Sequence, residues 1–143
     1  DSTLISREEF EKDLLANYEL MNQAGIAHTD APYFVPPYEH YNAEIASWAK
    51  SMGIQLINFT PGSGTNADYT TPEMKNYKSS ETIYKQVLSK EKEKGLNGYI
   101  ILIHLGTDDK RTDKFYQNGM RKMISKLRKE GYVFTGLAEA LNR

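Results

Sequence analysis

The chain has 143 residues, of which 39% are hydrophobic and 26% are charged, and its formal net charge is -1 at pH 7. This size and composition predict an ordinary globular domain with a hydrophobic core. The near-zero net charge, without a block made of Lys and Arg alone, argues against nucleic-acid binding. No apolar run approaches the length of a membrane span, and the lack of cysteine excludes disulfide bonds and thiolate metal sites.

The first predicted element is a helix that begins after Ser6. Ser6 and Glu9 have the spacing of a capping box, in which each side chain accepts a hydrogen bond from the other residue's backbone N–H. Apolar residues then recur at helical spacing, and Gly25 ends the helix. The recurring residues are Phe10, Leu14, Tyr18 and Met21.

A strand, a helix and a second strand are predicted next. The strand at 33–35 is short, because the two prolines that follow it cannot continue it. The second amphipathic helix ends at Gly53, and its apolar positions are Tyr41, Ile45, Trp48 and Met52. The stretch IQLINF predicts another strand at 54–59.

The second half repeats this alternation after a long loop at 60–79. A third helix is predicted at 79–95, capped by a serine and closed by a glycine, and a strand follows at 98–104. A fourth helix ends at Gly131, a last strand is expected at 132–134, and a short helix ends the chain. Strands that alternate with helices of this length predict an α/β fold of βα units, with a parallel sheet and right-handed crossovers.

Three polar side chains stand where predicted strands end: Tyr38, Asp68 and His104. Ligands of parallel sheets bind beyond the carboxyl ends of the strands, so these side chains are expected to share one rim. Taken alone, a histidine at a strand end is more often a hydrogen-bonded structural residue than a catalyst. The loop at 60–79 adds to the functional interpretation, because structureless loops of that length are uncommon in compact domains.

Other features are weaker indications of function. The stretch PGSGTN could cradle a phosphate, but it lacks the lysine and the spacing of a phosphate-binding loop, so an ordinary Gly/Ser loop is the better interpretation. His28 and His40 lack the spacing of metal ligands, both to each other and to His104. A metal site built from this chain alone is therefore not expected.

The three strand ends resemble motifs of the NodB-homology polysaccharide deacetylases, carbohydrate esterase family four. YFVPPYEHYN, which contains Pro37 and Tyr38, resembles the family motif Phe-Arg-Pro-Pro-Tyr-Gly-x-Tyr-Asn. NADYTT resembles the family's Asp-Trp motif through Asp68, with Tyr69 in place of the tryptophan. IILIHLGTD resembles its Leu-x-Leu-x-His motif, which ends in His104. The motifs occur in the family's order, and the resemblance covers nearly the whole chain.

Two departures from the family pattern shape the expected fold. The family's Thr-Phe-Asp-Asp strand and His-x-x-x-His segment, which supply the catalytic base and the Asp-His-His ligands of a divalent metal, usually zinc, do not occur here. The resemblance therefore implies that residues 1–143 form a single, incomplete domain, the C-terminal part of a deformed, TIM-like (β/α) barrel. Four strands cannot close a barrel, so an unpaired edge is expected, covered by a missing N-terminal half or by another copy of the chain. The second departure is Val35, where the family has an arginine that orients the base.

The resemblance also implies a role for each matching residue. The family hydrolyses the acetamide of N-acetylated sugars, and the backbone N–H of Tyr38 would stabilise the oxyanion. His104 would protonate the departing amine, and Asp68 would hold the imidazole in one tautomer and favour its charged form. The substrate-binding surface would contain Pro37, Tyr69 and Leu102, the last as the floor under the acetyl methyl group.

These expectations combine into a metal-dependent polysaccharide or peptidoglycan N-deacetylase, a hydrolase of non-peptide C–N bonds, of which this chain carries the general-acid half. The resemblance also implies a secreted, periplasmic or cell-envelope protein, and this chain alone is expected to be inactive. The alternative is a non-catalytic carbohydrate-binding or scaffold domain derived from a deacetylase, which Val35 would permit. A third interpretation is an unrelated, doubly wound phosphate binder that uses GSGTN.

Overall fold

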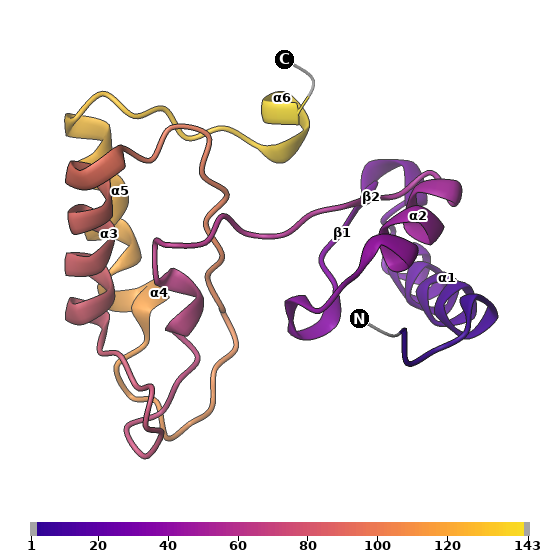
Figure 1. The fold of residues 1–143 in the computed structure, drawn as a ribbon, viewed down its shortest axis with the longest axis horizontal. Coiled ribbons are helices and arrows are strands. Elements are labelled where there is room, and N and C mark those ends of the chain that lie inside the picture. Colours follow the sequence, from indigo (N-terminus) through magenta and orange to yellow (C-terminus); the bar gives the residue numbers. More distant parts are fainter. Residues whose placement is uncertain (1–2, 142–143) are drawn as a thin grey trace. The chain divides into compact units, whose positions relative to one another are not determined.

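The computed structural model describes residues 3–141. Its contacts divide the chain into two compact units, Asp1–Asn58 and Phe59–Arg143. Each unit has its own hydrophobic core, and the parallel strands lie in the first unit (Figure 1). The expectation of a single, incomplete domain stays a prediction.

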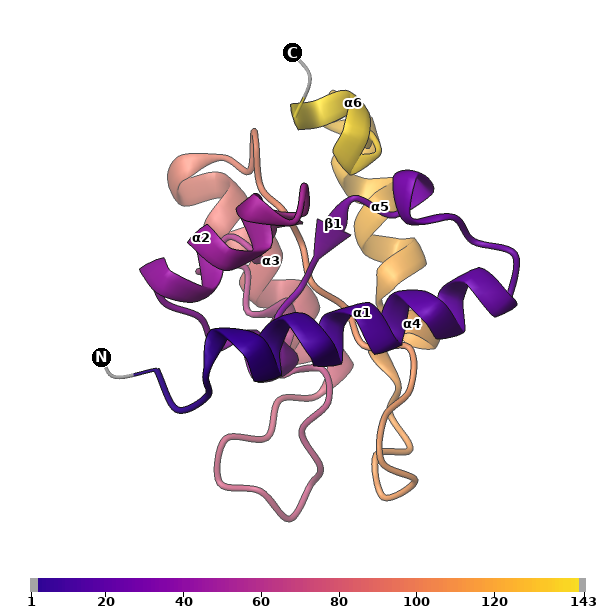
Figure 2. The ribbon, with the colours of Figure 1, turned by 90° about the vertical axis from the view of Figure 1, so that its right-hand side faces the viewer.

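The first unit contains two α-helices, two short strands and two 3-10 helices. In chain order these elements are α1 Arg7–Gln23, η1 His28–Asp30, β1 Tyr33–Phe34, η2 Pro37–Glu39, α2 Ala43–Ser51 and β2 Gln55–Leu56. Figure 2 gives a clear view of α1 along its length, with α2 and β1 behind it in the same unit.

Helix α1 begins and packs as the sequence predicts. The Ser6 hydroxyl accepts a hydrogen bond from the Glu9 N–H at 3.2 Å, and the Glu9 carboxylate accepts one from the Ser6 N–H at 2.8 Å, which confirms the capping box. The bond from the Ser6 backbone is the main reason that the pKa of Glu9 lies below its ordinary value. One face of the helix enters the core of the unit, which is formed by Phe10, Leu14, Tyr18, Ala49 and Ile54.

The two strands form a small parallel sheet, in which Tyr33 lies opposite Gln55 and Phe34 lies opposite Leu56. The Gln55 N–H donates to the Pro32 carbonyl at 2.8 Å. A parallel pair joined through α2 confirms the predicted mixture of helices and parallel strands for this unit. The finer expectation, a (β/α) barrel, stays a prediction.

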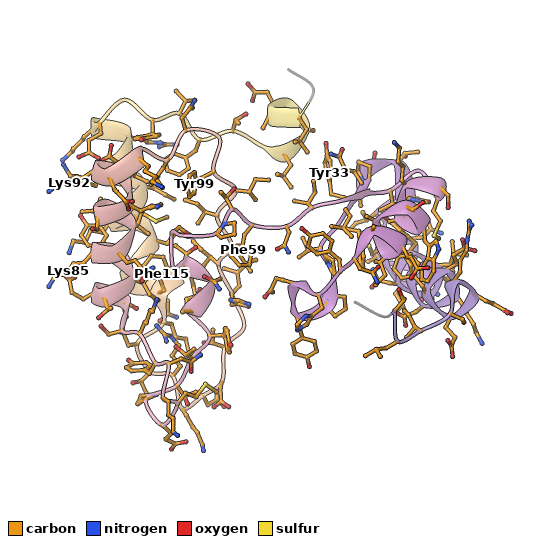
Figure 3. The ribbon with its side chains drawn as sticks, in the orientation of Figure 1. Tyr33, Phe59, Lys85, Lys92, Tyr99 and Phe115 are labelled. Atoms are coloured by element: carbon orange, nitrogen blue, oxygen red, sulfur yellow. The ribbon has the colours of Figure 1, made fainter. Side chains whose placement is uncertain are left out.

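The second unit is a helical layer with long irregular segments packed against it. Its elements are η3 Thr65–Ala67, α3 Ser80–Lys94, α4 Phe115–Asn118, α5 Met120–Lys129 and α6 Leu137–Leu141. Helices α3 and α5 lie side by side (Figures 1 and 2). Lys85 and Lys92 point outward from α3, as Figure 3 shows, and the core forms on its other face. The core residues are Ile83, Val87, Leu96, Phe115, Met123 and Leu127.

Two predicted strands are wrong within the described residues. The stretch 98–104 has no regular strand, and the Thr60 N–H, in the segment after β2, donates to the Ile100 carbonyl at 2.8 Å. The Ile100 N–H instead donates to the Thr60 hydroxyl at 3.0 Å. The stretch 132–134 is also irregular, and Val133 is 87% exposed. Both stretches have the composition of strands. A strand also needs a neighbouring strand with which it can form backbone hydrogen bonds, and composition does not show whether one is present.

Candidate functional site

The structure brings Asp68 and His104 into direct contact. The His104 ring Nδ1 lies 2.6 Å from Asp68 Oδ1, and the His104 backbone N–H donates to Asp68 Oδ2 at 2.9 Å. The aspartate side chain is 1% exposed, whereas the histidine side chain is 29% exposed. One buried carboxylate therefore holds both the main chain and the ring of the same histidine, and the ring remains accessible.

A tight turn places Asp68 beneath the histidine. Asp68 follows η3, and its backbone N–H donates to the Thr65 carbonyl at 3.0 Å. Two residues later, the Thr70 N–H and hydroxyl both donate to the Ala67 carbonyl, at 3.1 and 2.6 Å. Because the turn on both sides of Asp68 is closed by hydrogen bonds, its carboxylate has a fixed direction.

His104 stands at the end of a stretch that is anchored in the core of the second unit. Tyr99, Ile101 and Ile103 pack against that core, and Tyr99 is labelled in Figure 3. Leu102 is half-buried and is not a member of this core cluster, as far as the described residues show. The Tyr69 ring meets the His104 ring edge to face, with ring centroids 5.4 Å apart, so Tyr69 borders the accessible imidazole.

Tyr38 lies in the turn η2 of the first unit, directly after Pro37. It adopts a left-handed conformation with φ 55° and ψ 21°, and Glu39 does the same with φ 57°. Non-glycine residues rarely adopt this conformation, and observed outliers of this kind cluster at functional sites. Tyr38 is 86% exposed. Pro37 and Tyr38 thus belong to one unit, and the other predicted site residues to the second.

The Gly/Ser stretch at 61–66 is not shaped as a ligand cradle. Ser63 and Thr65 are both 0% exposed, and their hydroxyls lie 3.0 Å apart in a hydrogen bond. Gly64 has a positive φ of 76°, and an added Cβ would lie 2.4 Å from the amide of Gln86. The left-handed backbone at Gly64 therefore accounts for the glycine without a phosphate, and the end of the Gln86 side chain lies over it.

Arg111 is a functional candidate that the sequence analysis did not identify. It is 0% exposed, and its guanidinium donates hydrogen bonds to the carbonyls of Thr70 and Lys78 in the loop 60–79. Nothing in the stretch TDDKRTD distinguishes this arginine from a solvated charge, because its acceptors are main-chain atoms far along the chain.

The first unit also contains a shallow groove of about 510 Å³ along α1 and β1. Its lining is mostly apolar and includes Leu20, Met21, Tyr33, Val35 and Pro37, with Asp13 as a charged member. Val35, which stands where the resembled family has an arginine, is 49% exposed here. This groove lies in the unit that contains the Pro-Pro-Tyr stretch.

Among residues 3–141, no three His, Cys, Asp or Glu side chains lie close enough to hold a metal ion together. The residues described here therefore do not fit the zinc site that the resemblance implies. None of the described helices has the length and hydropathy needed to cross a membrane. Comparisons of the chain with protein-family models, curated proteins and solved structures found no match.

Proposed function

We propose that this chain supplies the general-acid half of a polysaccharide or peptidoglycan N-deacetylase, a hydrolase that releases acetate from N-acetylated sugars. The observation that carries the proposal is the contact between Asp68 and His104, in which a buried carboxylate lies 2.6 Å from the ring Nδ1 of an accessible histidine. The choice of deacetylation over other proton-transfer reactions comes from the resemblance of the sequence motifs.

In this proposal His104 gives a proton to the departing amine. Nδ1 faces the carboxylate, so that nitrogen carries a hydrogen and Nε2 is the atom that meets the substrate. Histidine is the side chain used most often as a general acid or base in enzymes. Asp68, through its contact with Nδ1, keeps the ring in one tautomer.

Tyr38 is proposed to stabilise the oxyanion through its backbone N–H. Its left-handed conformation, followed by that of Glu39, turns the chain sharply after Pro37. A backbone donor fixed in advance stabilises developing negative charge without reorganisation during the reaction. Pro37, Tyr69 and Leu102 are proposed to contact the sugar, with Leu102 beneath the acetyl methyl group.

The proposal includes a divalent metal, zinc by resemblance, held by residues outside positions 3–141. That metal would activate the attacking water, and no described residue is assigned to it. A secreted or cell-envelope location, which the resemblance implies, belongs to the same proposal.

The test is acetate release from an N-acetylated polysaccharide by the complete protein with zinc present. His104→Ala should lower kcat about 10²–10⁴-fold, which is the usual effect of losing a positioned general acid. His28→Ala is the matched control, since His28 is an exposed histidine outside the three motifs. Undiminished turnover in His104→Ala would refute the proposed role.

A non-catalytic carbohydrate-binding domain is the second candidate. It is favoured by two exposed aromatic rings, Tyr38 and Tyr41, at 86% and 53% exposure. Aromatic rings that combine an apolar face with a polar tip are suited to binding surfaces. Retention of polysaccharide by a complete protein that releases no acetate would favour this candidate over the enzyme.

A further inference from the structure

Two separate cross-links join the loop 60–79 to the segment 104–111. The first is the Asp68–His104 pair. The second is made by Arg111, whose guanidinium donates hydrogen bonds to two carbonyls of the loop. The two segments are therefore fixed to each other at both ends of 104–111.

The guanidinium of Arg111 is held in a specific geometry. One nitrogen donates to the Thr70 carbonyl, and the other donates to the Lys78 carbonyl at 3.0 Å. The guanidinium carbon lies 5.4 Å from the centre of the Tyr77 ring, and the residue is 0% exposed. These contacts close residues 70–78 into a loop around the guanidinium.

An ion pair does not account for these contacts, because both acceptors are uncharged main-chain carbonyls. A buried arginine is costly to desolvate, so its contacts must compensate for that cost. Its planar fork can bind two carbonyls at once in fixed directions, which the single ammonium group of lysine does not reproduce. Through these contacts Arg111 fixes Thr70 relative to Lys78, and its charge separately helps to lower the pKa of Asp113.

The position of Thr70 is passed directly to Asp68. The Thr70 N–H and hydroxyl both donate to the Ala67 carbonyl, at 3.1 and 2.6 Å, and Asp68 lies between these two residues. A shift of Thr70 would open this turn and move the Asp68 carboxylate. That carboxylate is the group that contacts the ring of His104.

We propose that Arg111 is a positioning residue for the Asp68–His104 pair. It fixes the turn that carries Asp68, and so keeps the hydrogen of the imidazole on Nδ1 and leaves Nε2 for the substrate. The catalytic consequence rests on the proposed deacetylase function, whereas the geometric consequence does not. The two are therefore tested by different measurements.

The geometric test is proton and nitrogen NMR of the His104 ring in the 143-residue chain. Arg111→Lys keeps the charge and removes the fork, so the downfield resonance of the Nδ1 hydrogen should be lost or broadened, and the ring nitrogens should report a mixture of tautomers. Arg121→Lys, at an exposed position of α5, is the matched control and should leave the spectrum unchanged. An unchanged His104 spectrum in folded Arg111→Lys would overturn the proposal.

A smaller change covers the case in which Arg111→Lys does not fold. Thr70→Val removes the hydroxyl, which donates to the Ala67 carbonyl and accepts from the Lys78 N–H at 3.3 Å and from Arg111 at 3.5 Å, and it retains the carbonyl that accepts from Arg111. A partial loss of the same Nδ1 resonance is expected, since the turn keeps its backbone bond. If this variant leaves the resonance as it is in the unsubstituted chain, the link from Thr70 to Asp68 is refuted.

The catalytic test is acetate release by the complete protein. Arg111→Lys should lower kcat about 10–100-fold with little change in KM, because small displacements of a catalytic group cost rate rather than binding. An altered His104 spectrum with unaltered kcat would overturn the catalytic consequence. A complete protein that releases no acetate, but whose spectrum responds to Arg111→Lys, would refute the deacetylase function and support the positioning role.

Discussion

Tyr38 and Glu39 both adopt left-handed backbone conformations, one after the other, which is energetically unfavourable for residues with side chains. Each such residue costs about 1–2 kcal/mol relative to ordinary backbone. The turn is maintained by the bonds from the Glu39 N–H to the Pro36 carbonyl, at 2.9 Å, and from the Asn58 amide to the Glu39 carbonyl, at 3.2 Å. The conformation itself is the feature that supports a role for the Tyr38 backbone.

A glycine at position 39 should therefore stabilise the protein relative to alanine at the same position. Both variants lose the glutamate side chain, but only glycine adopts a φ of 57° without steric cost. Since glycine also increases the entropy of the unfolded chain, the expected net advantage of Glu39→Gly over Glu39→Ala is about 0.5–1 kcal/mol. Urea unfolding of the two variants measures the difference. Equal stabilities would contradict the left-handed conformation.

At this scale the sequence predicts a residue well when its partner is also part of a recognisable motif. Asp68 and His104 were both expected at the ends of strands from their motifs, and the structure places their side-chain atoms 2.6 Å apart. Arg111 acts on main-chain carbonyls of Thr70 and Lys78, and every residue type has a carbonyl. The pattern of side chains in the sequence therefore does not indicate which carbonyls Arg111 contacts.

Helix α3 begins with a contact from a distant residue. The Ser79 hydroxyl caps the helix by accepting from the Thr82 N–H at 3.1 Å, and the Asp113 carboxylate accepts from the Ser80 N–H at 2.6 Å. Burial alone would raise the pKa of Asp113, but the hydrogen bonds from Ser80, together with Asn118 and the Arg111 charge, bring its pKa below the ordinary value. A negative charge at a helix N-terminus is also favourable.

This lowered pKa makes the stability of α3 depend on acid. A carboxylate with a lower pKa in the folded state contributes stability above its unfolded value, near pH 4, and that stability is lost as pH falls through the folded value. The free energy of unfolding should therefore fall below about pH 4, and Asp113→Asn should show a smaller fall. Glu9 and Glu81 also have lowered pKa values, so the difference between the two proteins isolates Asp113. Denaturant titrations from about pH 2 to 7, the range in which carboxylates titrate, measure this difference. Parallel pH profiles would contradict the role of Asp113.

Helices were more predictable than strands for a physical reason. A helix satisfies its hydrogen bonds within one segment, so local caps and periodic apolar residues suffice, as in α1 and α3. A strand depends on a partner elsewhere in the chain, and the stretch 98–104 meets Thr60 through one backbone bond and one side-chain bond. The apolar residues of this stretch indicate burial rather than a strand, since Tyr99, Ile101 and Ile103 pack on the core.

For the whole molecule, metal binding is the property that best separates the chain from the complete deacetylase of the proposal. A tight zinc site needs three or four ligands in one place, and residues 3–141 offer no group of three. Calorimetric titration of the 143-residue chain with zinc should therefore show no binding at concentrations on the order of micromolar, where a tight site would be filled. The matched control is the same titration with His28→Ala, His40→Ala and His104→Ala. A tight, single-site isotherm would contradict the assignment of the metal ligands outside this chain.

The fold as a whole was predictable only at its coarsest level. Alternating helices and strands predict a parallel sheet, and β1 and β2 confirm that arrangement with the register Tyr33–Gln55. The division into two compact units was not predictable, because the boundary at Asn58 and Phe59 falls inside the apolar stretch IQLINF rather than in a polar linker. Composition therefore gives no sign of where the contacts separate.

The shared carboxylate of Asp68 has a mechanical consequence for His104. A carboxylate group is planar and rigid, so Oδ1 cannot move without Oδ2, and these two atoms contact the ring and the amide of one residue. A ligand that displaces the imidazole together with Oδ1 is therefore expected to change the hydrogen bond from the His104 backbone N–H to Oδ2 as well. Binding of a ligand to the imidazole should thus change the amide NMR resonance of His104, without any probe attached to the side chain.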